Sequence, residues 1–484
     1  MSENSTNPAN SAIIPGNSGR PAHRITLQEK LAFASGSVLG AGAPSVLLLL
    51  LFPVYNIILG VSPALLGWVQ AIMRMWDAFT DPFFGYLSDN TKSRWGRRKP
   101  YIAVGGVIAS LIFPFIWTPS PGWSETTLFL YLLVTVLCFL SAYSAFQIPF
   151  ESLGVELTTD YNEKTRLYAF RAYLPPVIGL GCQWILPLVK SDFFADPMQG
   201  LALISISLGV LMLGTLMVPL YKLKERAPVE MGEGDRIPLG RSLRLVLTNR
   251  PFLHIAAMTV FCNFAASIFQ QAGLYAQVYV LYDGDLGRGA TLNAYVALVY
   301  FFVNYFCIHL GSKLAQRYNK HQVVIGAACL TFIAGLLKIV LYNPEMPYLV
   351  LLLPFFTAPA GAVGSFMINS LMADVAHYGE WKNGVRQEAL FTAAASWLYK
   401  FSISIASIFS GYYLVWIGFD VALEGNQTDF TKSWLIIGMV LASCIPAVIT
   451  ILAMWFYPLT QKRMDGYSRD LEERRRLRLG GDGA

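Results

Sequence analysis

The sequence predicts an all-α polytopic membrane protein, with twelve transmembrane helices arranged as two six-helix pseudo-repeats. The first observation is composition: of 484 residues, 55% are hydrophobic and only 14% are Asp, Glu, Lys or Arg, against roughly 25% in soluble domains. The second is a succession of long apolar stretches, and the third is the placement of positive charge between alternate stretches. Charged residues are too scarce to cover the surface of soluble domains of this total length. A soluble protein is therefore excluded.

The apolar stretches define the predicted helices in order. Each is long enough to cross about 30 Å of hydrocarbon, which takes about 20 helical residues. Residues 1–29 before them are polar and rich in Asn, Ser, Pro and Gly, which predicts a disordered tail without a targeting signal. The predicted helices are 31–59, 64–87, 100–118, 126–157, 167–189, 200–221, 251–281, 291–312, 322–342, 346–375, 388–418 and 433–457.

The distribution of Lys and Arg predicts the orientation. Of the 36 cationic residues, 29 fall on the side that holds both termini, 3 fall in the opposite loops, and 4 lie within helices. Positive charge is retained on the cytoplasmic side, so both termini are expected in the cytoplasm and the chain in the cell membrane. The net charge of +6 follows from this bias and requires no nucleic-acid partner.

The longest polar connection, 222–250, divides the chain into two halves, 30–221 and 251–458, followed by a basic cytoplasmic tail, 459–484. Six plus six helices around a central cytoplasmic loop is the layout of a duplicated transporter. Enzyme chemistry is not indicated, because the six cysteines stand singly and no HExxH, P-loop or GxSxG motif occurs. No cofactor is predicted.

Ionisable residues at bilayer depth are costly and therefore informative. Arg74, Asp77 and Asp81 share one face of the second helix, with the Thr80 hydroxyl beside them. Two carboxylates one turn apart can hold Na⁺ through hard oxygen ligands or share a proton. The alternative is structural: Arg74 neutralises Asp77, and the group joins helices.

Two lysines also lie within predicted helices. Lys400, in the eleventh helix, is too deep to reach the interface and is predicted to hold the carboxylates when the cation is absent. A fixed interhelical salt bridge is the alternative. Lys338, near the outer end of the ninth helix, is expected to snorkel to the interface.

Charged loops follow the second and tenth helices and are candidate gates. Ion pairs between such clusters can close the cytoplasmic side and break on opening, although positive-inside topology alone also explains basic loops. The candidate gating residues are Asp89, Arg97 and Arg98 in the first loop, and Asp374, Glu380 and Arg386 in the second.

These stretches resemble the glycoside–pentoside–hexuronide:cation symporter family of the major facilitator superfamily. The similarity is spread through the chain in conserved order: Arg74-Met-Trp-Asp77-Ala-Phe-Thr-Asp81-Pro82, Gln147-Ile-Pro-Phe-Glu-Ser-Leu, Asp160 through Arg171, and Asp374 through Lys400. The resemblance implies the major facilitator fold and alternating access. It also implies a cation site of Asp77, Asp81, Thr80 and Ser144, a charge partner at Lys400 beside that site, and a sugar-associated arginine at Arg171. Arg74 is the second candidate charge partner, from its place on the same helical face.

The departures from the family concern the substrate. Ala41 aligns with a sugar-binding aspartate of the galactoside carriers, a second such aspartate aligns with Gln147, and a sugar-stacking Trp aligns with Glu151. Galactoside specificity is therefore not implied, but Gln147 and Glu151 still offer donors and acceptors to a polar ligand. His377 stands where the family usually has Asp, as a pH-sensitive gate or a plain loop residue.

The sequence thus favours a secondary active transporter, a monomer in the lipid bilayer that couples Na⁺ or H⁺ to uptake of a small molecule, a sugar or glycoside. The first alternative keeps the same cation-coupled carrier but moves a lysolipid or another organic anion. A channel or intramembrane enzyme is the remote alternative, since no filter loop, nucleophile or metal cluster is visible.

Overall fold

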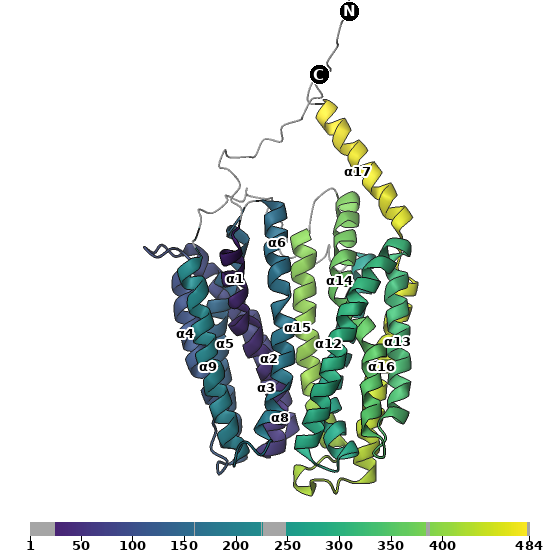
Figure 1. Cartoon of the computed structure of the whole chain (residues 1–484). Coiled ribbons are helices and arrows are strands. Elements are labelled where there is room, and N and C mark those ends of the chain that lie inside the picture. Colours follow the sequence, from purple (N-terminus) through teal and green to yellow (C-terminus); the bar gives the residue numbers. More distant parts are fainter. Residues whose placement is uncertain (1–24, 159, 224, 226–247, 384–387, 482–484) are drawn as a thin grey trace, which may run out of the picture.

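A computed structural model describes residues 25–158, 160–223, 225, 248–383 and 388–481, and within them the chain is helical with no β-strand (Figure 1). The all-α fold class is confirmed. Each predicted span has a helical counterpart. The elements before the central loop are α1 (Leu27–Ser35), η1 (Val38–Gly42), α2 (Ala43–Phe52), η2 (Pro53–Ile58), α3 (Pro63–Asn90), α4 (Lys99–Ile116), α5 (Glu125–Glu156), α6 (Tyr161–Ala172), α7 (Leu174–Gln183), α8 (Ile185–Val189) and α9 (Pro197–Lys222).

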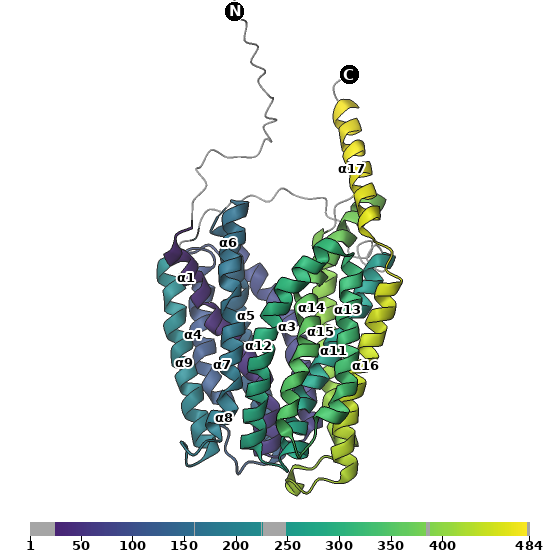
Figure 2. The ribbon, with the colours of Figure 1, turned by 45° about the vertical axis from the view of Figure 1, so that its right-hand side comes forward.

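The elements after the central loop continue the bundle and add one helix outside it. They are α11 (Arg250–Ala276), η3 (Gln277–Leu281), α12 (Leu286–Arg317), α13 (Lys320–Leu341), η4 (Pro347–Leu352), α14 (Leu353–Asn383), α15 (Glu388–Trp416), η5 (Val421–Leu423), α16 (Asp429–Trp455) and α17 (Gln461–Gly481). Figure 2 shows α17 extending beyond the bundle at the end where α1 begins, hereafter the terminal end. The opposite end is called the distal end.

Local chemistry sets where these helices begin and bend. The Asp196 side chain accepts from Met198 and Gln199 N–H groups to cap α9, whose first residue is Pro197. Within the first span, Pro44 has no N–H to offer the Gly40 carbonyl. That carbonyl instead accepts from the Tyr143 hydroxyl at 2.6 Å, next to a π-helical turn over Val38–Gly42.

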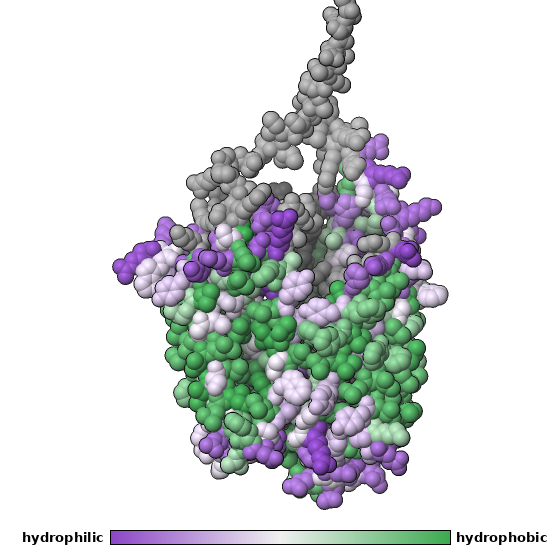
Figure 3. Space-filling view, viewed as in Figure 1, coloured by the Kyte–Doolittle hydropathy of each residue, from purple (hydrophilic) through white to green (hydrophobic). Residues whose placement is uncertain are grey.

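The surface is that of a membrane protein. Figure 3 shows a broad apolar band around the bundle, with hydrophilic residues gathered towards both ends. In the part of the chain that the structure describes, nine helices are long and apolar enough to cross a membrane. The charged helix α3 is not among them, because Arg74, Asp77 and Asp81 lie within it and lower its hydropathy.

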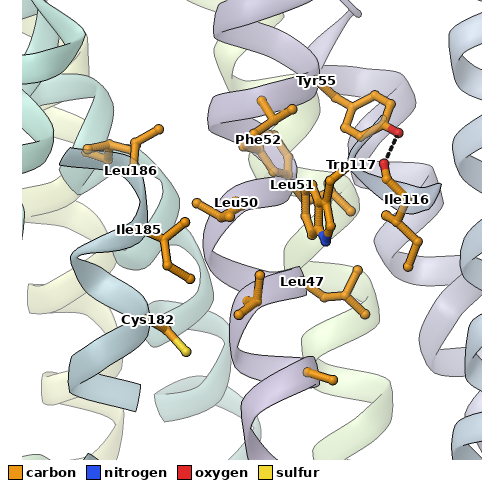
Figure 4. Packing of buried hydrophobic residues seen from close by; sticks show 14 of the residues in the cluster. Leu47, Leu50, Leu51, Phe52, Tyr55, Ile116, Trp117, Cys182, Ile185 and Leu186 are labelled. Atoms are coloured by element: carbon orange, nitrogen blue, oxygen red, sulfur yellow. Dashed lines mark hydrogen bonds between the residues drawn. The ribbon is translucent and has the colours of Figure 1, made fainter. Parts of the chain in front are cut away.

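The helices pack as two groups, the elements before the central loop and those after it. The groups meet where α3 packs against α15 and where α12 packs against both α7 and α8. At the distal end one continuous buried core crosses from the first group to the second, including Leu47, Tyr55 and Tyr279. Figure 4 shows part of it, where the Tyr55 hydroxyl donates to the Ile116 carbonyl at 2.5 Å. A separate core in the second group, around Phe252 and Phe391, lies apart from it.

Candidate functional site

The charged face of α3 forms the centre of the site. Arg74 Nη1 lies 3.5 Å from Asp77 Oδ2, as expected for residues three apart on one helix. Both side chains are mostly buried. Asp81 is one turn further along the same face and has different partners, so the two carboxylates are held separately.

Asp81 joins a hydroxyl network between α3 and α5. Ser144 of α5 donates to Asp81 Oδ1 at 2.9 Å, and its oxygen lies 3.0 Å from the Thr80 hydroxyl. Thr80 and Ser144 are both buried. The structure therefore brings together three of the predicted cation ligands, Asp81, Thr80 and Ser144, as a set of oxygen atoms.

The other oxygen of Asp81 is paired across the molecule. Lys400 of α15 lies 2.8 Å from Asp81 Oδ2, and both side chains are about one-third exposed. The close approach of α3 and α15 makes this pair possible: a Cβ on Gly67 would come within 2.6 Å of the Ser407 carbonyl oxygen. The ion pair therefore links the first helix group to the second.

The sequence-predicted substrate residues form a second cluster, on α5 and α6. Arg171 contacts both carboxylate oxygens of Glu151 at 2.6 Å and donates to the Ser37 hydroxyl at 3.0 Å. Its guanidinium lies over the Phe33 ring, 4.8 Å from the centroid. Gln147 donates to Glu151 at 2.8 Å, while its Oε1 has no hydrogen-bond partner among the described residues. The cluster is self-paired yet retains a free acceptor.

The first candidate gate pairs within its own helix group. Arg98 lies 3.2 Å from Asp89 and 2.9 Å from Glu156 of α5, and Arg97 also pairs with Glu156. Glu225 accepts from the backbone N–H groups of residues 97, 98 and 99 at 2.6–2.7 Å, where a negative charge at the start of α4 is stabilising. Neither Glu156 nor Glu225 was predicted, because their partners are distant in sequence.

Glu163, at the start of α6, extends these contacts at the terminal end. It lies 3.5 Å from Lys30 and 3.1 Å from Arg166. Burial disfavours its carboxylate, but the two cations outweigh burial and lower the pKa of Glu163 below its ordinary value.

The second candidate gate is likewise paired within its own group. Asp374 of α14 lies 2.7 Å from Lys320 of α13. Glu380 is on the last turns of α14, and Arg386 lies outside the described residues. His377 lies 3.0 Å from the Ser468 hydroxyl of α17. The ion pairs of Arg97, Arg98 and Asp374 thus each stay within one helix group.

The two helix groups are instead joined at the distal end. The Tyr275 hydroxyl donates to Asn56 at 2.6 Å, and both residues are buried. Asn293 donates to Gln183 at 3.2 Å. These four residues, here called the distal seal, close the bundle on the side away from the termini.

A cavity of about 1330 Å³ lies between the distal seal and the terminal end, mostly within the second helix group. Its wall follows α14 from Leu353 to Ala376 and includes Lys400. Asp77, Asp81 and the Gln147, Glu151 and Arg171 cluster do not line it. The cavity therefore meets the α3 site through Lys400.

Lys338 also lines this cavity, and the prediction that it snorkels is wrong. Its side chain is 0% exposed, and its ammonium donates to Ser443 at 2.6 Å and to the Met439 carbonyl at 3.2 Å. Both partners belong to α16, so packing against that helix prevents the side chain from reaching the interface.

Comparison with known proteins adds three findings. The family model described as MFS/sugar transport protein matches residues 32–461. The uncharacterized symporter YnaJ of Bacillus subtilis is 26% identical, covering 94% of this chain and 97% of the relative, and the isoprimeverose transporter of Lactiplantibacillus pentosus is 25% identical, covering 74% of each. A bacterial homolog of the lysosomal transporter Spinster, solved inward-facing and unoccupied, superposes with a TM-score of 0.64 at 14% identity, over 89% of this chain and 95% of that one.

Proposed function

Because the chain belongs to the MFS/sugar transport protein family, we propose that it is a cation-coupled symporter that carries a sugar or glycoside by alternating access. It is a transporter, not an enzyme. One relative is named an isoprimeverose transporter and another a symporter, which supports a glycoside substrate. The chemistry of the chain's own residues has to supply both the coupling and the selectivity.

The observation that carries this proposal is the Asp81–Lys400 ion pair between the two helix groups. A cation bound by Asp77, Asp81, Thr80 and Ser144 competes with Lys400 for the Asp81 carboxylate. Its binding releases Lys400, which also faces the cavity. Cation binding therefore changes the cavity wall and the link between the helix groups at once, which couples cation to substrate.

The oxygen set favours Na⁺ over H⁺ as the coupling ion. A metal cation needs several oxygen ligands, and two buried hydroxyls stand beside the Asp81 carboxylate. A proton needs only one carboxylate oxygen. Arg74 balances the second carboxylate, Asp77, at 3.5 Å, so the site does not hold two unpaired negative charges before the cation arrives.

Gln147, Glu151 and Arg171 are proposed to recognise the sugar hydroxyls. The free Gln147 Oε1 can accept from a hydroxyl. The Arg171–Glu151 pair offers a donor and an acceptor once a ligand replaces part of their mutual contact. This cluster and the cavity lie in different helix groups, so substrate would bridge them when the groups close.

The terminal end is proposed to face the cytoplasm of a cell whose plasma membrane contains the protein. The bias of cationic residues towards that end supports this orientation. With the distal seal closed and the gates paired within their own groups, the conformation corresponds to an inward-facing carrier. Asp89, Arg97, Arg98, Asp374, Glu380 and Arg386 would re-pair between the groups when the cytoplasmic side closes.

The test is uptake into proteoliposomes that contain the purified full chain. Labelled xylosides and glucosides are offered with an inward Na⁺ gradient, an inward H⁺ gradient or neither. We expect accumulation of at least one glycoside with the Na⁺ gradient, and its loss when Na⁺ is equal on both sides. Absence of uptake of every sugar and glycoside under all three conditions would contradict the proposed function.

A further inference from the structure

A buried amide on the cavity wall has an unused acceptor. Gln277 is the first residue of the π-helical turn η3, it is only 3% exposed, and it lines the cavity. Its side chain is hydrogen-bonded to Tyr342, which lines the same cavity, but Gln277 Oε1 has no partner among the described residues. Leaving a buried acceptor unsatisfied is costly, and π-helical turns are frequent at functional sites. A ligand that donates to Gln277 Oε1 would remove this cost.

The amides of Asn293 and Gln183 lie near this acceptor. Both residues line the same cavity as Gln277. Gly289 of α12 packs against the residue that follows Gln277, since a Cβ on Gly289 would lie 2.9 Å from Val278 Cα. Asn293 is one turn further along the same face of α12. The hydrogen bond from Asn293 to Gln183 therefore lies within about one helical turn of Gln277.

These three amides suit a ligand hydroxyl. The bond between the Asn293 and Gln183 side chains uses Asn293 Nδ2 and Gln183 Oε1, so Gln183 Nε2 can still donate and Asn293 Oδ1 can still accept. A hydroxyl both donates and accepts, which matches this mixture of groups. A carboxylate or phosphate oxygen without a proton has no hydrogen to offer Gln277 Oε1.

We propose that Gln277, Asn293 and Gln183 form a hydroxyl-binding subsite for the sugar, here called the distal amide subsite. The proposal rests on the proposed sugar symport and gives the sugar ligands beyond the cluster on α5 and α6. The Asn293–Gln183 bond belongs to the distal seal and joins the two helix groups. A sugar bound here contacts both groups beside the contact that must break when the distal side opens, so substrate binding and opening act on the same hydrogen bond.

The test removes single hydrogen-bond donors from the sugar. Methyl β-D-glucoside is compared with its monodeoxyfluoro analogues, in each of which fluorine replaces one hydroxyl and cannot donate. Binding is measured by titration calorimetry on the full chain in nanodiscs, with NaCl present. We expect at least one analogue to bind the native chain about tenfold more weakly, because Gln277 Oε1 loses its donor. In Gln277→Leu the same replacement should weaken binding less than about twofold.

Two further variants separate the subsite from general damage. Thr357→Val is the matched control: Thr357 lines the same cavity, but its hydroxyl already donates to the Leu353 carbonyl at 3.2 Å within its own helix. Its losses of affinity should equal those of the native chain. The double variant Gln277→Leu/Tyr342→Phe removes both members of a hydrogen-bonded pair, which is nearly neutral for stability. It should fold and should show the same insensitivity to fluorine as Gln277→Leu.

The outcomes distinguish the subsite from the proposed function. If every analogue weakens binding to the native chain and to the folded Gln277 variants equally, or if none weakens binding to the native chain, the distal amide subsite is overturned. Binding of methyl β-D-glucoside itself then leaves sugar symport standing. If the native chain binds neither methyl β-D-glucoside nor methyl β-D-xyloside, the subsite and the proposed function fail together.

Discussion

Asp81 holds two different partners on its two oxygens, the Ser144 hydroxyl at 2.9 Å and the Lys400 ammonium at 2.8 Å. A carboxylate shared in this way can change partner without leaving its place. Removing Lys400 leaves Asp81 with its hydroxyl contacts but without the competing cation. Lys400 is therefore the residue that we propose links cation binding to a change in the rest of the molecule.

We expect Lys400→Ala to uncouple transport. Downhill equilibration of the sugar should continue, but the accumulation ratio under a Na⁺ gradient should fall close to one, because Na⁺ binding no longer breaks the link between α3 and α15. Uptake and counterflow in proteoliposomes measure the two activities separately. Accumulation equal to that of the native chain would count against the exchange of Lys400 for a cation.

Arg171 depends on the shape of its guanidinium as well as on its charge. Both Glu151 oxygens are bound, and the plane rests on Phe33. Lysine cannot reproduce this fork, so we expect Arg171→Lys to raise the KM for sugar by roughly 10- to 150-fold, which corresponds to about 1.5–3 kcal/mol for a hydrogen bond to a charged group. An unchanged KM in initial-rate measurements would remove Arg171 from the proposed sugar site.

Individual residues show how far sequence reasoning reaches. Asp77, Asp81 and Thr80 could be placed on one face because helical spacing is local, and the scarcity of charge singled out Lys400 as a partner. Glu156 and Glu225 could not be found, since their cationic and N–H partners are more than fifty residues away. The prediction that Lys338 snorkels was wrong, because its distance from the helix end does not reveal that Ser443 of α16 offers a hydroxyl to its ammonium.

At the scale of the helices, the site depends on how closely α3 and α15 pack. Gly67 lies against the Ser407 carbonyl and Gly411 against the Pro63 carbonyl, so both helices lack side chains where they approach. Small residues allow such approach in membranes. The ion pair between Asp81 and Lys400 joins the same two helices.

Gly67→Ala should therefore lower both thermal stability and coupled transport. An added Cβ would lie 2.6 Å from a backbone oxygen, and overpacking of this kind typically costs about 1–3 kcal/mol. Gly214→Ala is the matched control, because that helical glycine has no atom within 4 Å of an added Cβ. If both variants unfold at the temperature of the native chain, the α3–α15 contact is not tightly packed.

The last helix, α17, shows where sequence patterns give less guidance. Its basic composition predicted a cytoplasmic tail, and its side chains contact α14. The Asp470 carboxylate accepts a hydrogen bond from the Trp381 indole N–H at 3.2 Å. The centroids of the Tyr467 and Trp381 rings lie 4.4 Å apart. A helix without an apolar stripe has no strong local signature, so such docking emerges only from the tertiary structure.

The whole molecule is closed at the distal seal, and its cavity extends towards the terminal end. Cys262, which is exposed and lines the cavity, provides a native reporter of this asymmetry. We expect a membrane-impermeant maleimide to label Cys262 faster from the terminal side than from the distal side, and Na⁺ with sugar to slow the labelling. Peptide mass spectrometry of oriented vesicles identifies the labelled cysteine; equal rates from both sides would contradict an inward-facing resting state.

The overall architecture was the most predictable level, because the apolar spans and the bias of positive charge reflect the bilayer itself. The relative placement of the cavity and the α3 site was not predictable. It depends on the contacts between Asn56 and Tyr275 and between Gln183 and Asn293, which join segments more than one hundred residues apart. These contacts stabilise one of the two conformations that alternating access requires.

We propose that a cation bound at Asp81 drives sugar transport. Its most direct test is simultaneous measurement of ²²Na⁺ and labelled glycoside uptake by proteoliposomes that contain the native chain or Asp81→Asn, with Asp465→Asn, exposed on α17, as the matched control. We expect a fixed ratio of Na⁺ to sugar for the native chain and the control, and loss of both Na⁺ co-uptake and sugar accumulation in Asp81→Asn. Sugar accumulation by Asp81→Asn with the native Na⁺ ratio would contradict it.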